Sequence, residues 1–161
     1  MYTEPTPEDA RFLNRLAWLG AGVSLLLSLV PWLQGDGINR DGVLYLYAAQ
    51  AIREQGLAES LALYGWPFYS LLIGGLASLG LELELAARLL GALCFAGLTH
   101  QFMRCLAFLA PDRLAGLFGL GLVLLLPQLN GIRSELVRDT GMLWFAFAAL
   151  HGLLHFRQHK R

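Results

Sequence analysis

The feature that most constrains this chain is a set of four apolar runs whose lengths approach that of a membrane span. They cover residues 13–33, 86–109, 114–129 and 141–156. A helix rises about 1.5 Å per residue, so crossing a hydrocarbon layer about 30 Å thick takes roughly 20 mostly apolar residues. Backbone groups in hydrocarbon must be hydrogen-bonded internally. Each run is therefore predicted to be a transmembrane helix.

The composition agrees with a membrane location. Of the 161 residues, 56% are hydrophobic and 15% are charged, whereas a soluble domain carries about 25% charged residues. The net charge is zero and no cluster of lysine and arginine stands out, so the predicted partner is the lipid bilayer and not a nucleic acid. The predicted fold class is an all-α integral membrane protein.

Two shorter segments between the first and second runs are predicted to be juxtamembrane helices in the first outer loop. Residues 42–56 place Leu44, Tyr47 and Ala51 on one face at three- and four-residue spacing, which suits an amphipathic helix at the membrane surface. Residues 66–79 are apolar for only 14 positions. Whether this second segment crosses the membrane decides the topology.

If residues 66–79 cross, the chain has five spans and its ends lie on opposite sides. If they only dip into the membrane, there are four spans and both termini are cytoplasmic. The four-span arrangement places seven basic residues in the cytoplasm and five outside, and the positive-inside rule favours it. The cytoplasmic residues are Arg11, Arg15, Arg104, Arg113, Arg157, Lys160 and Arg161, and the outer ones are Arg40, Arg53, Arg88, Arg133 and Arg138. We therefore treat residues 1–161 as one transmembrane module with about four spans.

The first run carries a stripe of small residues. Gly20, Ser24 and Ser28 recur every four positions, on one face of the expected helix. Small residues let transmembrane helices approach closely, so this face is predicted to pack against another span.

Two polar clusters lie outside the membrane in the four-span arrangement. Asn39, Arg40 and Asp41 follow the first run, and Arg138-Asp139 opens the fourth. An aspartate near the interface can act as a general base toward a hydroxyl, and arginine can hold a phosphate with two parallel hydrogen bonds. The alternative is that these are solvated loop charges that only set the topology.

Motifs of several other enzyme classes are absent from the sequence. It contains no glycine-rich phosphate loop, no G-x-S-x-G elbow and no H-E-x-x-H zinc motif. The two cysteines, Cys94 and Cys105, have no second pair that would complete a zinc site. No metal site is therefore predicted.

Four motifs resemble those of the C-type (GT-C) glycosyltransferases, which include the protein O-mannosyltransferases and the lipid A aminoarabinose transferase. In order, they are similar to the first-loop acidic motif, a juxtamembrane helix, the opening of a span and the second acidic position. The motifs are NRDGVLYL at 39–46, WPFYSLL at 66–72, LAARLL at 85–90 and LVRD at 136–139. The resemblance extends over about residues 11–161.

The resemblance implies a membrane glycosyltransferase module that moves a sugar, with inversion, from a polyprenyl-phosphate donor to an acceptor on the periplasmic face. It implies that Asp41 is the catalytic acid/base and that Asp139 holds the second acidic position. Arg40, Arg133, Arg138 and Tyr45 would contact the substrate or its phosphate. The resemblance also implies a location in the bacterial inner membrane. It implies no fixed cofactor, and it is compatible with a divalent metal.

Two departures from the family pattern affect this interpretation. Many relatives have a second acid directly after the first-loop aspartate, where this chain has Gly42. Family enzymes also run to several hundred residues, so we expect this chain to be the N-terminal part of such an enzyme, completed by further helices or a membrane partner. The alternative function is a small non-catalytic membrane subunit that acts by helix packing.

Overall fold

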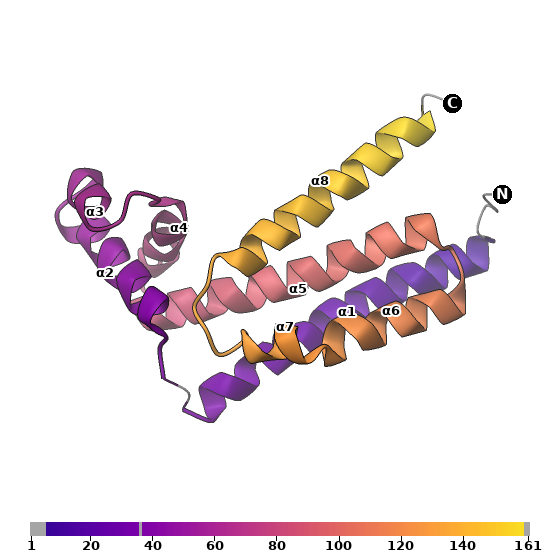
Figure 1. The fold of residues 1–161 in the computed structure, drawn as a ribbon, viewed down its shortest axis with the longest axis horizontal. Coiled ribbons are helices and arrows are strands. Elements are labelled where there is room, and N and C mark those ends of the chain that lie inside the picture. Colours follow the sequence, from indigo (N-terminus) through magenta and orange to yellow (C-terminus); the bar gives the residue numbers. More distant parts are fainter. Residues whose placement is uncertain (1–5, 36, 160–161) are drawn as a thin grey trace.

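A computed structural model describes residues 6–35 and 37–159, and every regular element in these ranges is a helix. Of the eight described helices, four form a bundle, three cluster at one of its ends, which we call the α2–α4 end, and a short one, α7, follows the bundle helix α6 (Figure 1). The helices are α1 (Pro7–Leu33), α2 (Arg40–Glu54), α3 (Leu57–Leu63), α4 (Phe68–Ala77), α5 (Leu83–Leu109), α6 (Arg113–Leu125), α7 (Pro127–Gly131) and α8 (Asp139–His159). The predicted all-α class is confirmed.

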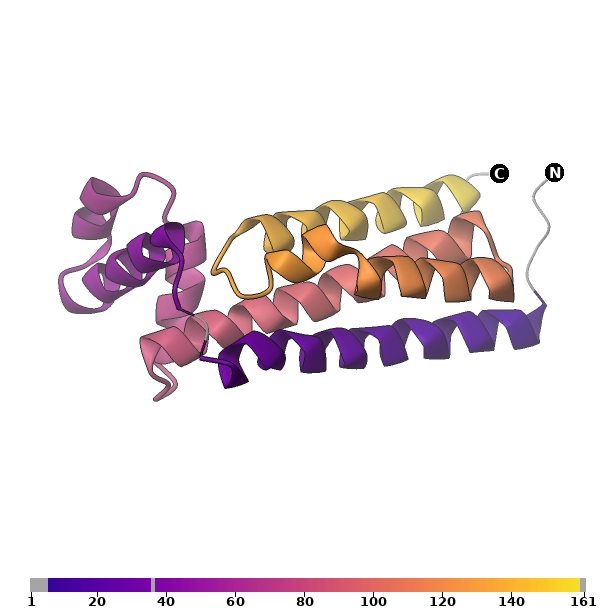
Figure 2. The ribbon, with the colours of Figure 1, turned by 60° about the horizontal axis from the view of Figure 1, so that its bottom comes forward.

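Helix α5 is the centre of this arrangement. It contacts α1, α6 and α8 along the bundle, and α2 and α4 at the α2–α4 end (Figure 2). Among the described elements α8 contacts α5 alone, and it leans away from α1 and α6 (Figure 1). The position of α8 therefore depends on a single helix–helix interface.

Three described helical segments are long and apolar enough to cross a membrane: Pro7–Leu33, Leu83–Leu109 and Arg113–Gly131. They correspond to the first three predicted spans. Helix α8 contains the fourth predicted run, residues 141–156, and is 21 residues long. It is not among these three candidates. Its second half carries polar side chains, including His151, His155 and Arg157.

Helix α4, within the weak 66–79 segment, is only ten residues long. At about 1.5 Å per residue it extends roughly 15 Å, half of the hydrocarbon thickness. The first turn of α1 and the last turn of α8 lie at the same end of the bundle, opposite the α2–α4 end (Figure 1). Lys160 and Arg161, which the charge argument places in the cytoplasm, lie outside the described residues.

Local chemistry explains where the observed helices differ from the predicted boundaries. Helix α1 begins six residues earlier than predicted because Thr6 caps it, its Oγ accepting a hydrogen bond from the Asp9 N–H at 3.2 Å. The third run is not continuous as predicted: Leu126 is extended, with φ −61° and ψ 117°, and separates α6 from α7. Proline disfavours a helical conformation in the residue before it, and Pro127 follows directly.

The small-residue stripe on α1 packs as predicted. A Cβ added at Gly20 would lie 2.5 Å from the Leu120 Cδ1, so α1 and α6 approach closely there. Ser24 is fully buried and its hydroxyl donates to the Phe95 carbonyl of α5 at 3.2 Å. This face of α1 therefore holds the bundle together at its contacts with α5 and α6.

Candidate functional site

The two polar motifs of the sequence meet at the α2–α4 end. The backbone N–H of Leu136 donates to the Asn39 Oδ1 at 2.9 Å, which joins the segment before α8 to the segment before α2. A Cβ added at Gly42 would lie 2.8 Å from the Leu136 Cβ and 2.6 Å from the Asn39 Oδ1. The first turn of α2 is thus packed directly against the loop that leads to α8.

This contact gives a physical reason for the Gly42 departure. Any side chain at position 42 would collide with Asn39 and Leu136, so an acidic residue has no room there in this arrangement. Asp41, in the first turn of α2, is exposed. It is the acidic residue that α2 presents near this junction.

A group of tyrosines connects α2, α4 and the loop before α8. The Tyr45 ring meets the rings of Tyr64 and Tyr69 edge-on, with centroids 5.4 and 5.2 Å away. Arg138 donates from Nη1 to the Tyr64 hydroxyl at 2.7 Å. Leu136 completes the apolar core beneath these rings. The loop before α8 is therefore tied both to α2 and to the segment before α4.

The pKa of the Tyr45 hydroxyl reflects the burial and the charges around it. Burial, followed by the hydrogen bond with Tyr64, raises the pKa of Tyr45 to about 12; the positive charge of Arg138 lowers this pKa and the charge of Asp41 raises it. Tyr45 is therefore neutral at physiological pH. Because both charges act on its hydroxyl, Asp41 and Arg138 lie within electrostatic range of the same group.

A cavity of about 540 Å³ lies between α4, α5 and the start of α8. Arg138 and Asp139 supply its charged groups, and Tyr69, Cys94 and Gly141 complete the more polar part of the wall. The remainder of the wall is apolar and consists of Trp66, Pro67, Phe68, Leu72, Met142 and Phe145. The cavity therefore has a mostly hydrophobic wall that includes one arginine and one aspartate.

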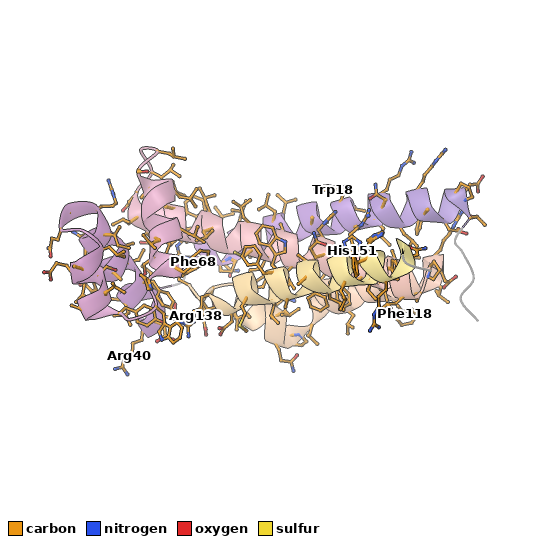
Figure 3. All side chains as sticks on the ribbon, turned by 90° about the horizontal axis from the view of Figure 1, so that it is seen from above. Trp18, Arg40, Phe68, Phe118, Arg138 and His151 are labelled. Atoms are coloured by element: carbon orange, nitrogen blue, oxygen red, sulfur yellow. The ribbon has the colours of Figure 1, made fainter. Side chains whose placement is uncertain are left out.

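The predicted site residues occupy different environments. Arg138 and Asp139 line the cavity, with Arg138 between α8 and the α2–α4 cluster, whereas Arg40 is exposed and points away from the molecule (Figure 3). Tyr45 is buried in the tyrosine group. Arg133 is also buried, does not line the cavity, and is hydrogen-bonded to Ser24 and Ser28 of α1. Among the described residues no three His, Cys, Asp or Glu side chains are grouped to hold a metal ion.

Sequence reasoning missed two parts of this site. Tyr64, the partner of Arg138, lies in a short loop without a recognisable pattern. Met142 and Phe145 looked like ordinary residues of a span, although they line the cavity on the α8 side. The WPFYSLL motif was the one signal for the opposite wall, because Trp66, Pro67, Phe68 and Leu72 belong to it.

Comparisons with protein-family models, with curated proteins and with solved structures find no match to this chain. The interpretation of the site therefore depends on its geometry and on the motif resemblance.

Proposed function

We propose that this chain is the transmembrane module of a C-type glycosyltransferase, which binds a lipid-linked sugar phosphate in the cavity between α4, α5 and α8. The observation that carries the proposal is the composition of this cavity: Arg138 and Asp139 are charged residues in a wall that is otherwise mostly apolar. A volume of about 540 Å³ falls within the range of small-ligand sites, roughly 300–1,000 Å³.

The proposed topology has four spans, with α8 as the fourth. Helix α8 is 21 residues long, which corresponds to about 31 Å, and its outward face carries Met142, Phe145, Leu153 and Phe156. The α2–α4 end would then lie outside the cytoplasm, with the cavity at the outer leaflet. The distribution of basic residues expected from the sequence, seven in the cytoplasm and five outside, supports cytoplasmic termini, as in a bacterial inner-membrane protein.

The chemistry of the cavity suits a lipid phosphate. The Arg138 guanidinium can form two parallel hydrogen bonds to phosphate oxygens. Asp139 opens α8, so the first N–H groups of that helix and its dipole add positive potential at the same end. Phe68, Leu72, Met142 and Phe145 would surround the lipid chain. The donor would therefore enter with its head toward Arg138 and its chain along α8.

In the proposed reaction, Asp41 accepts the proton of an acceptor hydroxyl as the hydroxyl oxygen attacks the anomeric carbon. The new carbon–oxygen bond forms while the bond from the anomeric carbon to the phosphate oxygen breaks, so the configuration inverts. The lipid phosphate leaves with the bonding electron pair, and Arg138 stabilises its charge. Asp139 holds the second acidic position beside Arg138.

Replacing Arg138 with glutamine is expected to weaken binding of a short alkyl phosphate by on the order of tenfold or more, because hydrogen bonds between charged groups contribute about 1.5–3 kcal/mol. The measurement is calorimetric titration of the purified chain in nonionic micelles with octyl phosphate, and with octanol as the uncharged ligand. Octanol binding should change little.

Arg53→Gln is the matched control, because it removes the same charge at the same end of the bundle from an exposed side chain outside the cavity. Its affinity for octyl phosphate should stay close to that of the unmodified chain. Equal losses in both variants would mean that net charge alone attracts the phosphate. Unchanged affinity in Arg138→Gln would contradict a phosphate site in this cavity.

One observation favours the alternative of a non-catalytic subunit. Helix α8 contacts α5 alone among the described elements and leaves Met142, Phe145 and Phe156 exposed, so another helix could pack there. This alternative assigns no chemistry to Asp41 or Asp139. It predicts that asparagine at either position leaves biological activity intact, whereas the glycosyltransferase proposal predicts its loss.

A further inference from the structure

Arg133 is the most deeply buried charged side chain described at the α2–α4 end of the bundle. Its residue is only 9% exposed, and its guanidinium carbon lies 4.3 Å from the centroid of the Phe95 ring on α5. A charge at this depth in a membrane bundle is costly, and such residues usually have a role beyond packing. Its surroundings indicate what this role is.

Four hydrogen bonds hold the Arg133 guanidinium. Nη1 donates to the Ser24 carbonyl at 2.9 Å and to the Ser28 hydroxyl at 2.8 Å, and Nη2 donates to the Ser24 hydroxyl at 3.1 Å. Nε donates to the Asn130 Oδ1 at 2.8 Å. The side chain therefore joins α1, α5 and α7 at one point.

No carboxylate among the described residues forms an ion pair with Arg133. Burial lowers the pKa of its guanidinium, but the group stays protonated at neutral pH. Its charge is compensated only by these oxygen acceptors and by the face of Phe95. Because a buried charge that loses its partners is strongly unfavourable, the network permits little displacement of the Arg133 backbone.

The Arg133 backbone begins the segment that leads to the cavity. Three residues later the Leu136 N–H is bound to Asn39, and two residues after that Arg138 is bound to Tyr64. Arg133 is thus the first of three attachment points along residues 133–138, and the only one of the three that lies inside the bundle. Without it, the segment would keep its contacts at the α2–α4 end but would lose its attachment to α1.

We infer that Arg133 is a positioning residue: it fixes residues 133–138 to α1 so that Arg138 and Asp139 face the cavity, and it does not itself contact the ligand. The attachment is independent of the proposed function, whereas its consequence for phosphate binding rests on that function. This inference separates Arg133 from Arg138, which the resemblance groups together as substrate or phosphate contacts.

The test combines two readouts on the purified chain. A spin label at Glu135→Cys, in a Cys94→Ala, Cys105→Ala background, reports the mobility of the segment, and titration with octyl phosphate reports the site. Arg133→Met keeps much of the side-chain volume without the charge. It should increase the mobility of the spin label and lower the affinity for octyl phosphate severalfold. Arg133→Lys, which keeps the charge but not the planar fork, should restore part of both.

Arg53→Met is the control, because Arg53 is an exposed basic residue of α2 outside the cavity, and it should change neither readout. An unchanged label spectrum in folded Arg133→Met would overturn the inference, and so would a loss of affinity without loosening, which would mean that Arg133 acts on the ligand directly. If the segment loosens but the unmodified chain binds no octyl phosphate, the attachment stands and the proposed function fails.

If Arg133→Met does not fold, Ser28→Ala decides, because it removes one acceptor and keeps the arginine. Ser28→Ala should increase the mobility of the spin label, but less than Arg133→Met is expected to. An unchanged spectrum in Ser28→Ala would then overturn the inference.

Discussion

Replacing Asp41 with asparagine is expected to lower the rate of sugar transfer by at least about a hundredfold. Removing a general base typically costs a factor of about 10²–10⁴, because the acceptor hydroxyl must then lose its proton to water. Asparagine preserves the size of the side chain, and Asp41 is exposed in the first turn of α2, so the fold should be unaffected. The measurement is transfer of labelled sugar from polyprenyl-phosphate donors in membranes that contain the chain.

Glu59→Gln is the matched control, because Glu59 is an exposed acid at the same end of the bundle, on α3, and does not line the cavity. Its transfer rate should equal that of the unmodified chain. Undiminished transfer by Asp41→Asn would remove Asp41 from the reaction. If Asp139→Asn then lost transfer, the base would be the acid that opens α8.

Replacing Gly97 with leucine is expected to detach α8 from α5. A Cβ at position 97 would lie 2.2 Å from the Trp144 Cε2, and the rigid indole can make room only if α8 moves. Overpacking of this kind costs about 1–3 kcal/mol and occasionally more. Because α8 contacts no other described helix, no second interface would keep it in place.

The reactivity of the two cysteine thiols reports whether α8 has detached from α5. The Cys94 thiol lies 3.3 Å from the Cβ position at Gly141 of α8, and the Cys105 thiol donates to the Phe147 carbonyl of α8. Both residues are buried. Because Cys94 also lines the cavity, Cys105 is the decisive reporter: its reaction with a small thiol reagent in micelles should be slow in the unmodified chain and much faster in Gly97→Leu.

Gly91→Leu provides the comparison, because the same substitution on the same helix meets open space. Its cysteines should react as slowly as those of the unmodified chain. Equally slow reaction in Gly97→Leu would mean that α8 is held by something other than its packing on α5.

Three helices long and apolar enough to cross a membrane could be predicted from the sequence, because an apolar run is a local signal. The stripe of Gly20, Ser24 and Ser28 likewise shows in the sequence that one face of α1 is buried. The break before Pro127 is also predictable from the sequence, because proline disfavours a helical conformation in the residue before it. These features depend on neighbours in the chain and not on the fold.

The contacts of the candidate site could not be predicted in the same way. Arg133 lies 109 residues from Ser24, and the sequence contains nothing that distinguishes it from Arg138 as a phosphate contact. Tyr64 becomes the partner of Arg138 only because α2, α3 and α4 fold back beside the start of α8. The resemblance predicts that Asp41 and Asp139 share one site. What the structure shows is a contact between the segments that carry them, through Asn39, Gly42 and Leu136.

The topology of the α2–α4 end tests the account most directly. Gly37 precedes α2 and Gly131 ends α7, and both are exposed with open space around them. Each would be replaced by cysteine in a Cys94→Ala, Cys105→Ala background and probed in intact cells with a membrane-impermeant maleimide. The account predicts that both positions are labelled from outside, because Asp41 and Asp139 share the outer face. Labelling of only one position, or of neither until the cells are lysed, would contradict it.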